Sequence, residues 1–216
     1  MTTPILLRID TSIASLQEGS VSRRLTDRAV EAYRAAFPAG EVRTRDLVAT
    51  PPPHFDPVAG SARRRGDALT PAEARAAALA DELAGELAGA TDLVIGMPLY
   101  NWGPPSALKA WFDHVIASPL ARHPQTMAPL IELRSARLVV ARGGAYGPET
   151  PRAGWDHATD WAEKSFTAIG IDLEVVAVEM TLAPGRAYLA EFEHVYHRDL
   201  AIAEERIAGA YAAPTG

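Results

Sequence analysis

Short runs of apolar, often β-branched residues alternate along this chain with longer segments in which apolar residues recur every three or four positions. The short runs predict strands of a parallel sheet that is covered on both faces, except that residues 41–46 alternate and fit a strand at or near an edge. The longer segments have the period of a helix with one buried face. Strands are expected over residues 4–9, 41–46, 93–95, 137–142 and 173–180, each followed by a helix.

Capping residues mark several of the helix ends. Ser20 or Ser22 can cap the first helix, which should end before Pro38. Residues 70–73 read TPAE, a capping box with proline at the first helical position, and the helix that follows is expected to run to about Ala88. The remaining helices are expected over roughly residues 108–115, 152–169 and 192–207.

Two segments show neither the alternation of a strand nor the apolar period of a helix. Residues 47–69 contain several prolines, glycines and arginines and predict a long loop, which in a compact domain is typical of a lid or a mobile segment. Residues 118–135 are interrupted by three prolines and are expected to be irregular.

The alternation of strand and helix predicts an α/β chain with a doubly wound, five-stranded parallel sheet and helices on both faces. Right-handed crossovers favour the flavodoxin-like strand order 2-1-3-4-5, with its switch point between the first and third strands. At 216 residues and without internal repeats, the chain is expected to form a single domain over residues 1–216. Ligands of such sheets bind at the carboxyl ends of the strands, so the loops there are the candidate site.

Composition narrows the function classes. The formal net charge of -6 and the pI near 5.5 argue against a general binder of nucleic acid or of anionic membranes. Cysteine is absent, which excludes disulfides, thiol catalysis and cysteine metal sites and favours the cytosol. The first ten residues contain too short an apolar run and no cleavage signal for a secretory leader, and no later run approaches membrane-spanning length, so neither segment is expected. We therefore expect a cytoplasmic protein without nucleic-acid or membrane partners.

Hydroxyl side chains gather between the first strand and the first helix. Thr11, Ser12, Ser20 and Ser22 are expected beside the amide groups of a helix amino terminus, a place that suits a phosphate. Neither the glycine pattern of dinucleotide-binding folds nor the Walker lysine loop occurs. A monophosphate held by hydroxyl groups is the favoured interpretation, and ordinary helix capping is the alternative.

Two further loops are expected at the same edge of the sheet. Tyr100, Asn101 and Trp102 follow the third strand, where two rings and an amide suit a flat, hydrogen-bonding ligand or simply cover the end of the sheet. Gly143 and Gly144 follow the fourth strand, and they let the backbone approach a ligand closely or form a tight turn.

Residues 96–113, which read GMPLYNWGPPSALKAWFD, resemble the central motif of the FMN-dependent NADH azoreductase and quinone reductase family. The sequence RGG at residues 142–144 resembles the second flavin loop of that family. The resemblance extends over most of the chain and implies non-covalently bound FMN in a homodimer with its active site at the subunit interface. It also implies a two-step exchange in which NADH or NADPH reduces the flavin and a quinone, an azo compound or a related aromatic acceptor then takes the electrons.

The same resemblance implies which residues contact FMN. Tyr100, Asn101 and Trp102 would also position the substrate, and no protein nucleophile is expected because the flavin carries the hydride. No metal site is assigned. The phosphate would be held by Ser12, Ser20, Val21 and Ser22, one edge of the isoalloxazine by Pro98, Leu99, Tyr100, Asn101 and Trp102, and its pyrimidine side by Arg142, Gly143 and Gly144.

The chain departs from the family pattern at four positions, Asp10, Thr11, Val21 and Ala141. A carboxylate beside a phosphate is unfavourable, so Asp10 either points away from the phosphate or weakens its binding.

Two alternative functions stay open at the level of the sequence. One is a dedicated biosynthetic reductase or oxidase that uses the same flavin site on one metabolite. The other is a flavodoxin-like binding protein that has lost FMN, which the departures at Asp10 and Val21 would favour. Substrate choice is expected to lie in residues 51–69, 118–133 and 146–155, where the sequence pattern is least informative.

Overall fold

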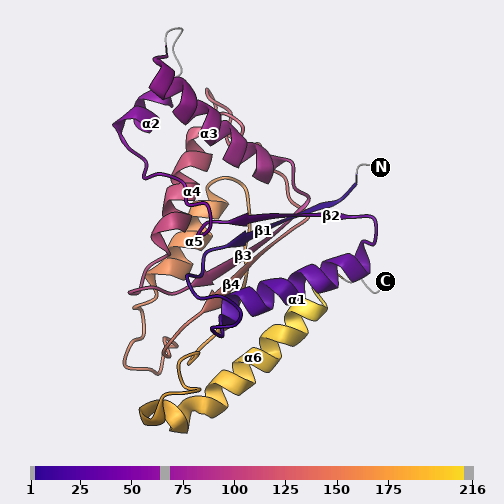
Figure 1. The fold of residues 1–216 in the computed structure, drawn as a ribbon, viewed down its shortest axis with the longest axis vertical. Coiled ribbons are helices and arrows are strands. Elements are labelled where there is room, and N and C mark those ends of the chain that lie inside the picture. Colours follow the sequence, from indigo (N-terminus) through magenta and orange to yellow (C-terminus); the bar gives the residue numbers. More distant parts are fainter. Residues whose placement is uncertain (1–2, 64–68, 212–216) are drawn as a thin grey trace.

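The computed structural model describes residues 3–63 and 69–211, which form a five-stranded parallel sheet between two layers of helices (Figure 1). The order across the sheet is β2-β1-β3-β4-β5, which confirms the predicted order and its switch point between β1 and β3. The strands are β1 (Ile5–Asp10), β2 (Glu41–Asp46), β3 (Asp92–Pro98), β4 (Ser135–Ala141) and β5 (Glu174–Val178).

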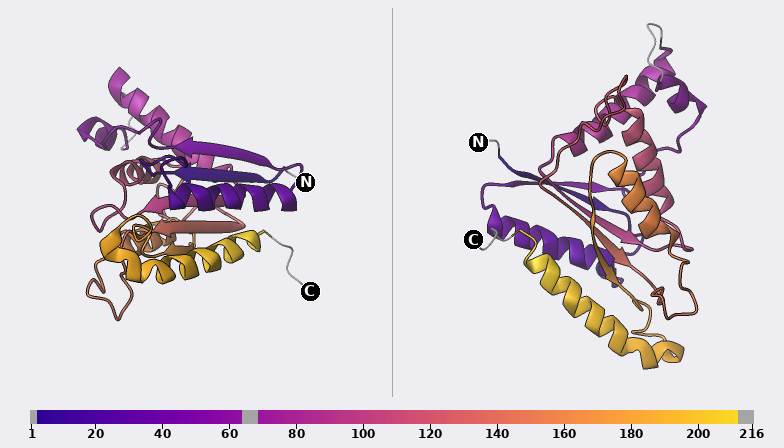
Figure 2. Two further views of the ribbon diagram at one scale, coloured as in Figure 1. Left: turned by 60° about the horizontal axis from the view of Figure 1, so that its bottom comes forward. Right: turned by 180° about the vertical axis from the view of Figure 1, so that it is seen from behind.

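Two helices cover one face of the sheet and three cover the other. Figure 2 shows from two further directions that helices lie on both sides of the sheet. On the first face lie α1 (Val21–Ala36) and α6 (Glu193–Ala208). On the second lie α3 (Pro71–Ala88), α4 (Ser106–Ala117) and α5 (His157–Thr167), and the short α2 (Pro57–Ala62) packs on α3. A 3₁₀ helix, Ala187–Phe192, precedes α6.

The sheet separates two apolar cores because successive side chains of a strand point to opposite faces. In β1, Leu7 belongs to the core under α3, α4 and α5, whereas Leu6 belongs to the core under α1 and α6. Every residue of β3 is buried, as expected for a central parallel strand. Trp111 of α4 and Phe166 of α5 stack with ring centroids 6.2 Å apart and fill the larger core.

The predicted helix caps are present. The Ser20 hydroxyl caps α1 by accepting the Arg23 amide at 3.3 Å. Thr70 and Glu73 form the reciprocal capping box at the start of α3. These local bonds fix where both helices begin.

The prediction of a loop throughout residues 47–69 was wrong, because α2 lies within it. This helix is short and made of small residues, so it has no detectable apolar period. Its start was nevertheless marked in the sequence, since Asp56 accepts the Ala59 amide at 2.8 Å and Pro57 is the first helical residue. Residues 64–68 of this segment lie outside the described part of the chain.

The predicted start of α5 at Arg152 was also wrong. The helix begins at His157, because the Asp156 carboxylate accepts the amides of Ala158 and Thr159 at 3.0 and 2.9 Å and so caps it. Residues 152–156 therefore lie in the turn and coil that precede the helix.

Candidate functional site

The loops at the carboxyl ends of β1, β3 and β4 enclose a cleft of about 560 Å³. It lies at the switch point between β1 and β3, where open α/β sheets bind their ligands. Eight of the twelve positions expected to contact a cofactor line it, and Asn101, Trp102, Arg142 and Gly144 do not. The lining residues are Ser12, Ala14, Glu18, Gly19, Ser20, Val21, Ser22, Pro98, Leu99, Tyr100, Ala141, Gly143, Thr181, Leu182, Pro184 and Tyr196.

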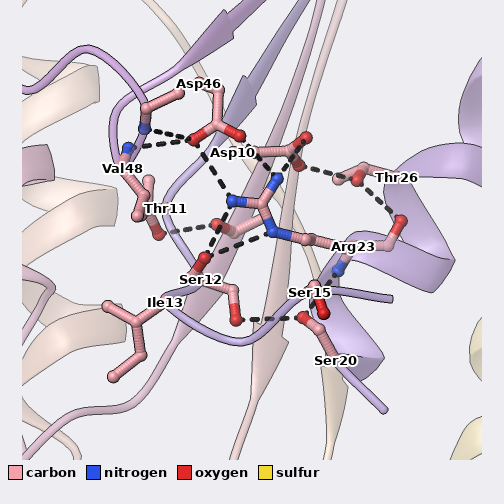
Figure 3. A network of polar contacts seen from close by, with 12 residues as sticks. Asp10, Thr11, Ser12, Ile13, Ser15, Ser20, Arg23, Thr26, Asp46 and Val48 are labelled. Atoms are coloured by element: carbon pink, nitrogen blue, oxygen red, sulfur yellow. Dashed lines mark hydrogen bonds and ion pairs between the residues drawn. The ribbon is translucent and has the colours of Figure 1, made fainter. Parts of the chain in front are cut away.

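Three buried serine hydroxyls converge at one end of the cleft, and Figure 3 shows two of them, those of Ser12 and Ser20. The Ser20 hydroxyl donates to the Ser12 hydroxyl at 3.0 Å and lies 3.5 Å from that of Ser22. The amides of Val21 and Ser22 are in the first turn of α1, where they have no acceptor within the helix. Neutral donors at the positive end of a helix dipole favour an anion, and their number and spacing suit a phosphate.

A hydrogen bond joins the loop after β1 to the turn after β3. The Ile13 amide donates to the Tyr100 hydroxyl at 3.0 Å. Tyr100 itself is anchored by reciprocal backbone bonds with Gly103, at 3.1 and 3.0 Å. Thr11 does not face the cleft, because its hydroxyl donates to the Gly96 carbonyl at 2.7 Å within the sheet. The two loops therefore form one connected wall.

Asn101 and Trp102 occupy the tip of this turn with φ of 49° and 66°. Positive φ at both central residues is the geometry of a type I′ turn, which is unusual for a residue as bulky as tryptophan. The Trp102 carbonyl accepts the His157 amide at 3.0 Å, and its ring lies edge-on to Trp155 at 5.6 Å. Both indoles are about half exposed, which places an aromatic pair on the surface outside the lining of the cleft.

The two glycines after β4 have different neighbours. A Cβ atom at Gly143 would lie 2.8 Å from Cδ1 of Leu182, so glycine lets Leu182 close over the end of the strand. At Gly144 the nearest atom would be Nη1 of Arg152 at 3.2 Å, at the end of a flexible side chain. Gly143 is therefore the position with the stricter steric requirement.

The guanidinium of Arg142 is held inside the protein. It forms ion pairs with Asp156 at 2.7 Å and Glu179 at 3.1 Å, and it donates to the Thr159 hydroxyl at 3.3 Å. Burial alone would raise the pKa of Asp156, but hydrogen bonds from Thr159 and the charge of Arg142 hold it below its ordinary value. The side chain of Arg142 therefore ties the start of the loop after β4 to Asp156 and Glu179, outside the lining of the cleft.

Asp10 points away from the serine hydroxyls (Figure 3). Its carboxylate pairs with Arg8 at 2.8 Å and Arg23 at 3.4 Å and accepts the Thr26 hydroxyl at 2.9 Å. Burial raises the pKa of Asp10 although these three partners favour its charged form. The departure from the family pattern at Asp10 therefore places no carboxylate among the hydroxyls of Ser12, Ser20 and Ser22.

Sequence reasoning missed the wall of the cleft that follows β5. Thr181, Leu182, Pro184 and Tyr196 line the cleft there, and Glu18 of the loop before α1 is also among the lining residues. Leu182 and Pro184 come after the last strand, at the same edge as the other loops, and that position was the available signal. Tyr196 has the spacing of the apolar face of α6, so the sequence pattern indicated only a core residue and not a residue that lines the cleft.

The cleft therefore has two chemically distinct parts. At one end are hydroxyl and amide donors suited to a phosphate. The other part is apolar and is lined by Pro98, Leu99 and Ala141 at the strand ends, with Leu182 opposite Gly143. Such an arrangement suits a planar, largely apolar ring system that carries a phosphate on a polar tail.

Comparison with known proteins agrees with the fold. A family model described as a flavodoxin-like fold matches residues 6–200. Among solved structures, an azoreductase from Bacillus anthracis str. Sterne superposes with a TM-score of 0.83 at 23% identity, over 97% of this chain and 99% of that one. An FMN-dependent NADH-azoreductase from Bacillus anthracis str. Ames Ancestor in complex with FMN gives a TM-score of 0.76 at 18% identity, over 98% and 100% of the two chains.

Similarity to curated proteins is closer. An FMN-dependent NADH:quinone oxidoreductase from Frankia alni is 39% identical over 97% of this chain and the whole of that protein. One from Xanthobacter autotrophicus is 41% identical over 79% of this chain and 83% of that protein. Within the described residues, no helix combines the length and apolar character needed to cross a membrane. The chain belongs to the flavodoxin-like family that includes these FMN-dependent NADH:quinone oxidoreductases.

Proposed function

We propose that this chain is an FMN-dependent oxidoreductase that uses NADH or NADPH to reduce quinones, azo compounds or related aromatic acceptors. The observation that carries this proposal is the cleft at the switch point, which joins a phosphate-binding end to an apolar part. Relatives of nearly the same length that are named for this activity support it.

The phosphate of FMN would be held by neutral groups. The hydroxyls of Ser12, Ser20 and Ser22 and the amides of Val21 and Ser22 provide donors at the amino terminus of α1. Hydrogen bonds to a charged acceptor are the strong ones, and burial of the hydroxyls strengthens them further. Val21 contributes its amide, so a polar side chain is not needed at this position.

The isoalloxazine would lie against the apolar part of the cleft. Pro98, Leu99 and Tyr100 would contact one edge of it, and the backbone at Gly143 would face its pyrimidine side. FMN supplies hydride transfer, and the protein supplies binding, orientation and electrostatics. Backbone amides at the strand ends can hydrogen-bond the polar ring atoms, and the apolar walls keep water from the ring.

Four expected contact residues lie outside the lining of the cleft, and we assign each a role that fits its position. Asn101 and Trp102, at the tip of the turn, would meet the flavin edge or the incoming acceptor, with Trp155 extending the aromatic surface. Arg142 would hold the loop after β4 through its ion pairs, and Gly144 would hold the same loop through its backbone carbonyl, which accepts the Met180 amide.

We further propose that the enzyme acts as a homodimer in the cytoplasm. The half-exposed indoles of Trp102 and Trp155 and the half-exposed Leu182 lie beside the site, and a second copy of the chain would cover them. Cytoplasmic localisation rests on the sequence alone, through its lack of cysteine.

The test combines cofactor loading with two half-reactions. The purified protein is titrated with FMN, and the loaded protein is mixed anaerobically with NADH or NADPH and then with a quinone or an azo dye. We expect the flavin absorption bands to bleach with a nicotinamide and to return with the acceptor. Ser20→Ala should weaken FMN binding, whereas Ser106→Ala, at an exposed position on α4, should not.

Other outcomes would favour the alternatives. Bleaching without return on any quinone or azo compound would favour a dedicated enzyme for one metabolite. Absence of saturable FMN binding would refute the oxidoreductase function and favour a binding protein that has lost the cofactor.

A further inference from the structure

The guanidinium of Arg23 lies between the loop that follows β1 and the carboxylate of Asp46 (Figure 3). Its Nε donates to the carbonyls of Ser12 at 3.2 Å and Ala14 at 3.1 Å, and its Nη2 donates to the Ser12 carbonyl at 2.8 Å. Ser12 and Ala14 line the cleft, whereas Arg23 does not. One side chain thus holds two carbonyl oxygens of the candidate phosphate loop from outside the lining of the cleft.

These contacts set the direction of the peptide groups in the loop. In a planar trans peptide the carbonyl and the amide point in opposite directions. With the Ser12 carbonyl bound to Arg23, the Ile13 amide points the other way and donates to Tyr100, a residue of the cleft wall. Carbonyl oxygens repel a phosphate, so binding the carbonyls of Ser12 and Ala14 to Arg23 keeps these two acceptors turned away from the cleft.

The charge of Arg23 is already matched. Two of its nitrogens contact the Asp46 carboxylate at 2.8 and 3.2 Å, and Asp10 lies 3.4 Å away. The hydrogen bond to Asp46 raises the pKa of Arg23 despite partial burial. Its side chain is 14% exposed, so its geometry is fixed by these partners rather than by solvent. A lysine could not reach both carbonyls and both carboxylates, because it is a point charge without a planar fork.

We propose that Arg23 is a positioning residue for the cofactor phosphate: it does not touch the phosphate, but it holds the loop of residues 12–14 in the conformation that binds it. This role rests on the proposed function, because it requires that the cleft binds FMN. Riboflavin has the same ring system as FMN but lacks the phosphate. A loop that binds the phosphate should therefore affect the affinity for FMN and not the affinity for riboflavin.

The experiment compares the affinities for FMN and riboflavin, measured by flavin fluorescence titration, in the wild type, Arg23→Gln and Arg23→Lys. Arg24→Gln is the matched control, because Arg24 is the next residue of α1 but pairs at the surface with Glu204 at 2.6 Å. For Arg23→Gln we expect the FMN affinity to fall about 30-fold and the riboflavin affinity to stay within about twofold. Arg23→Lys should fall between the wild type and Arg23→Gln, and Arg24→Gln should match the wild type.

Thermal unfolding of the cofactor-free proteins shows whether each variant is folded before its flavin affinities are compared. If Arg23→Gln does not fold, Arg23→Lys is compared with the wild type, and a selective loss of FMN affinity is still expected. Equal losses for FMN and riboflavin, or no loss for either, would overturn the role of Arg23 while leaving the proposed function intact. A wild type that binds neither flavin would overturn the proposed function and this role together.

Discussion

Two substitutions at Asn101 separate the role of its side chain from that of its backbone. Asn101 and Trp102 are the central residues of a turn closed by two backbone bonds between Tyr100 and Gly103, and both have positive φ. Asn101→Ala and Asn101→Gly remove the same amide group. They differ in that glycine adopts positive φ readily, whereas alanine does not.

The expected magnitudes follow from this geometry. Alanine at φ near 49° should cost on the order of 1 kcal/mol of folding free energy, because it loses the tolerance that asparagine has for this region. Glycine should change stability by about 0.5 kcal/mol or less, since relief of strain offsets its greater freedom in the unfolded chain. If the amide contacts the flavin, either variant should lose about 1 kcal/mol of FMN binding free energy, roughly a fivefold weaker Kd.

The assay measures both quantities on each protein. Urea unfolding of the cofactor-free chain gives stability, and fluorescence titration gives the Kd for FMN. An Asn101→Gly variant that binds FMN as tightly as the wild type would show that the amide makes no contact. An Asn101→Ala variant as stable as the wild type would refute the argument from backbone strain.

Three further predictions concern stability. Gly143→Ala should cost about 1–2 kcal/mol, because the new Cβ would meet Leu182 at 2.8 Å, and adding Leu182→Ala should recover most of that loss in a double-mutant cycle measured by urea unfolding. Gly170→Ala should be more damaging, by about 3 kcal/mol, since Gly170 has φ of +83° and its Cβ would lie 2.6 Å from that of Pro129; a thermal unfolding midpoint close to the wild-type value would contradict this. Burial raises the pKa of Asp10 above its ordinary value of 3.8, so the stability that this group contributes is fully present below pH 3.8 and is lost as the pH rises through the folded-state pKa. An asparagine side chain does not titrate, so the stability of the Asp10→Asn variant minus that of the wild type should increase from acidic to neutral pH. A constant difference across that range would argue against the raised pKa.

Much of the fold was predictable because it depends on local patterns. The apolar run at residues 93–95 identified the buried central strand, and the capping box at Thr70 fixed the start of α3 to the residue. Strand order followed from the alternation of elements and the handedness of crossovers. The short α2 was missed because a helix of small residues produces no apolar stripe.

The site was predictable only where its residues come directly after a strand or at a helix start. Ser12, Ser20 and Tyr100 satisfy that rule and line the cleft. The function of Arg23 depends on Asp46, which reaches it through the pairing of β1 with β2, and no spacing along the chain reveals such a contact. The directions of the Trp102 and Arg142 side chains depend likewise on tertiary partners that single-sequence patterns do not contain.

The cleft is lined by α1, at Val21 and Ser22, and by α6, at Tyr196. These two helices pack against each other on the same face of the sheet (Figure 2). During synthesis, the part of the chain that carries β1 and α1 leaves the ribosome long before α6 does. A nascent chain therefore has no complete cleft until α6 has emerged and docked against α1.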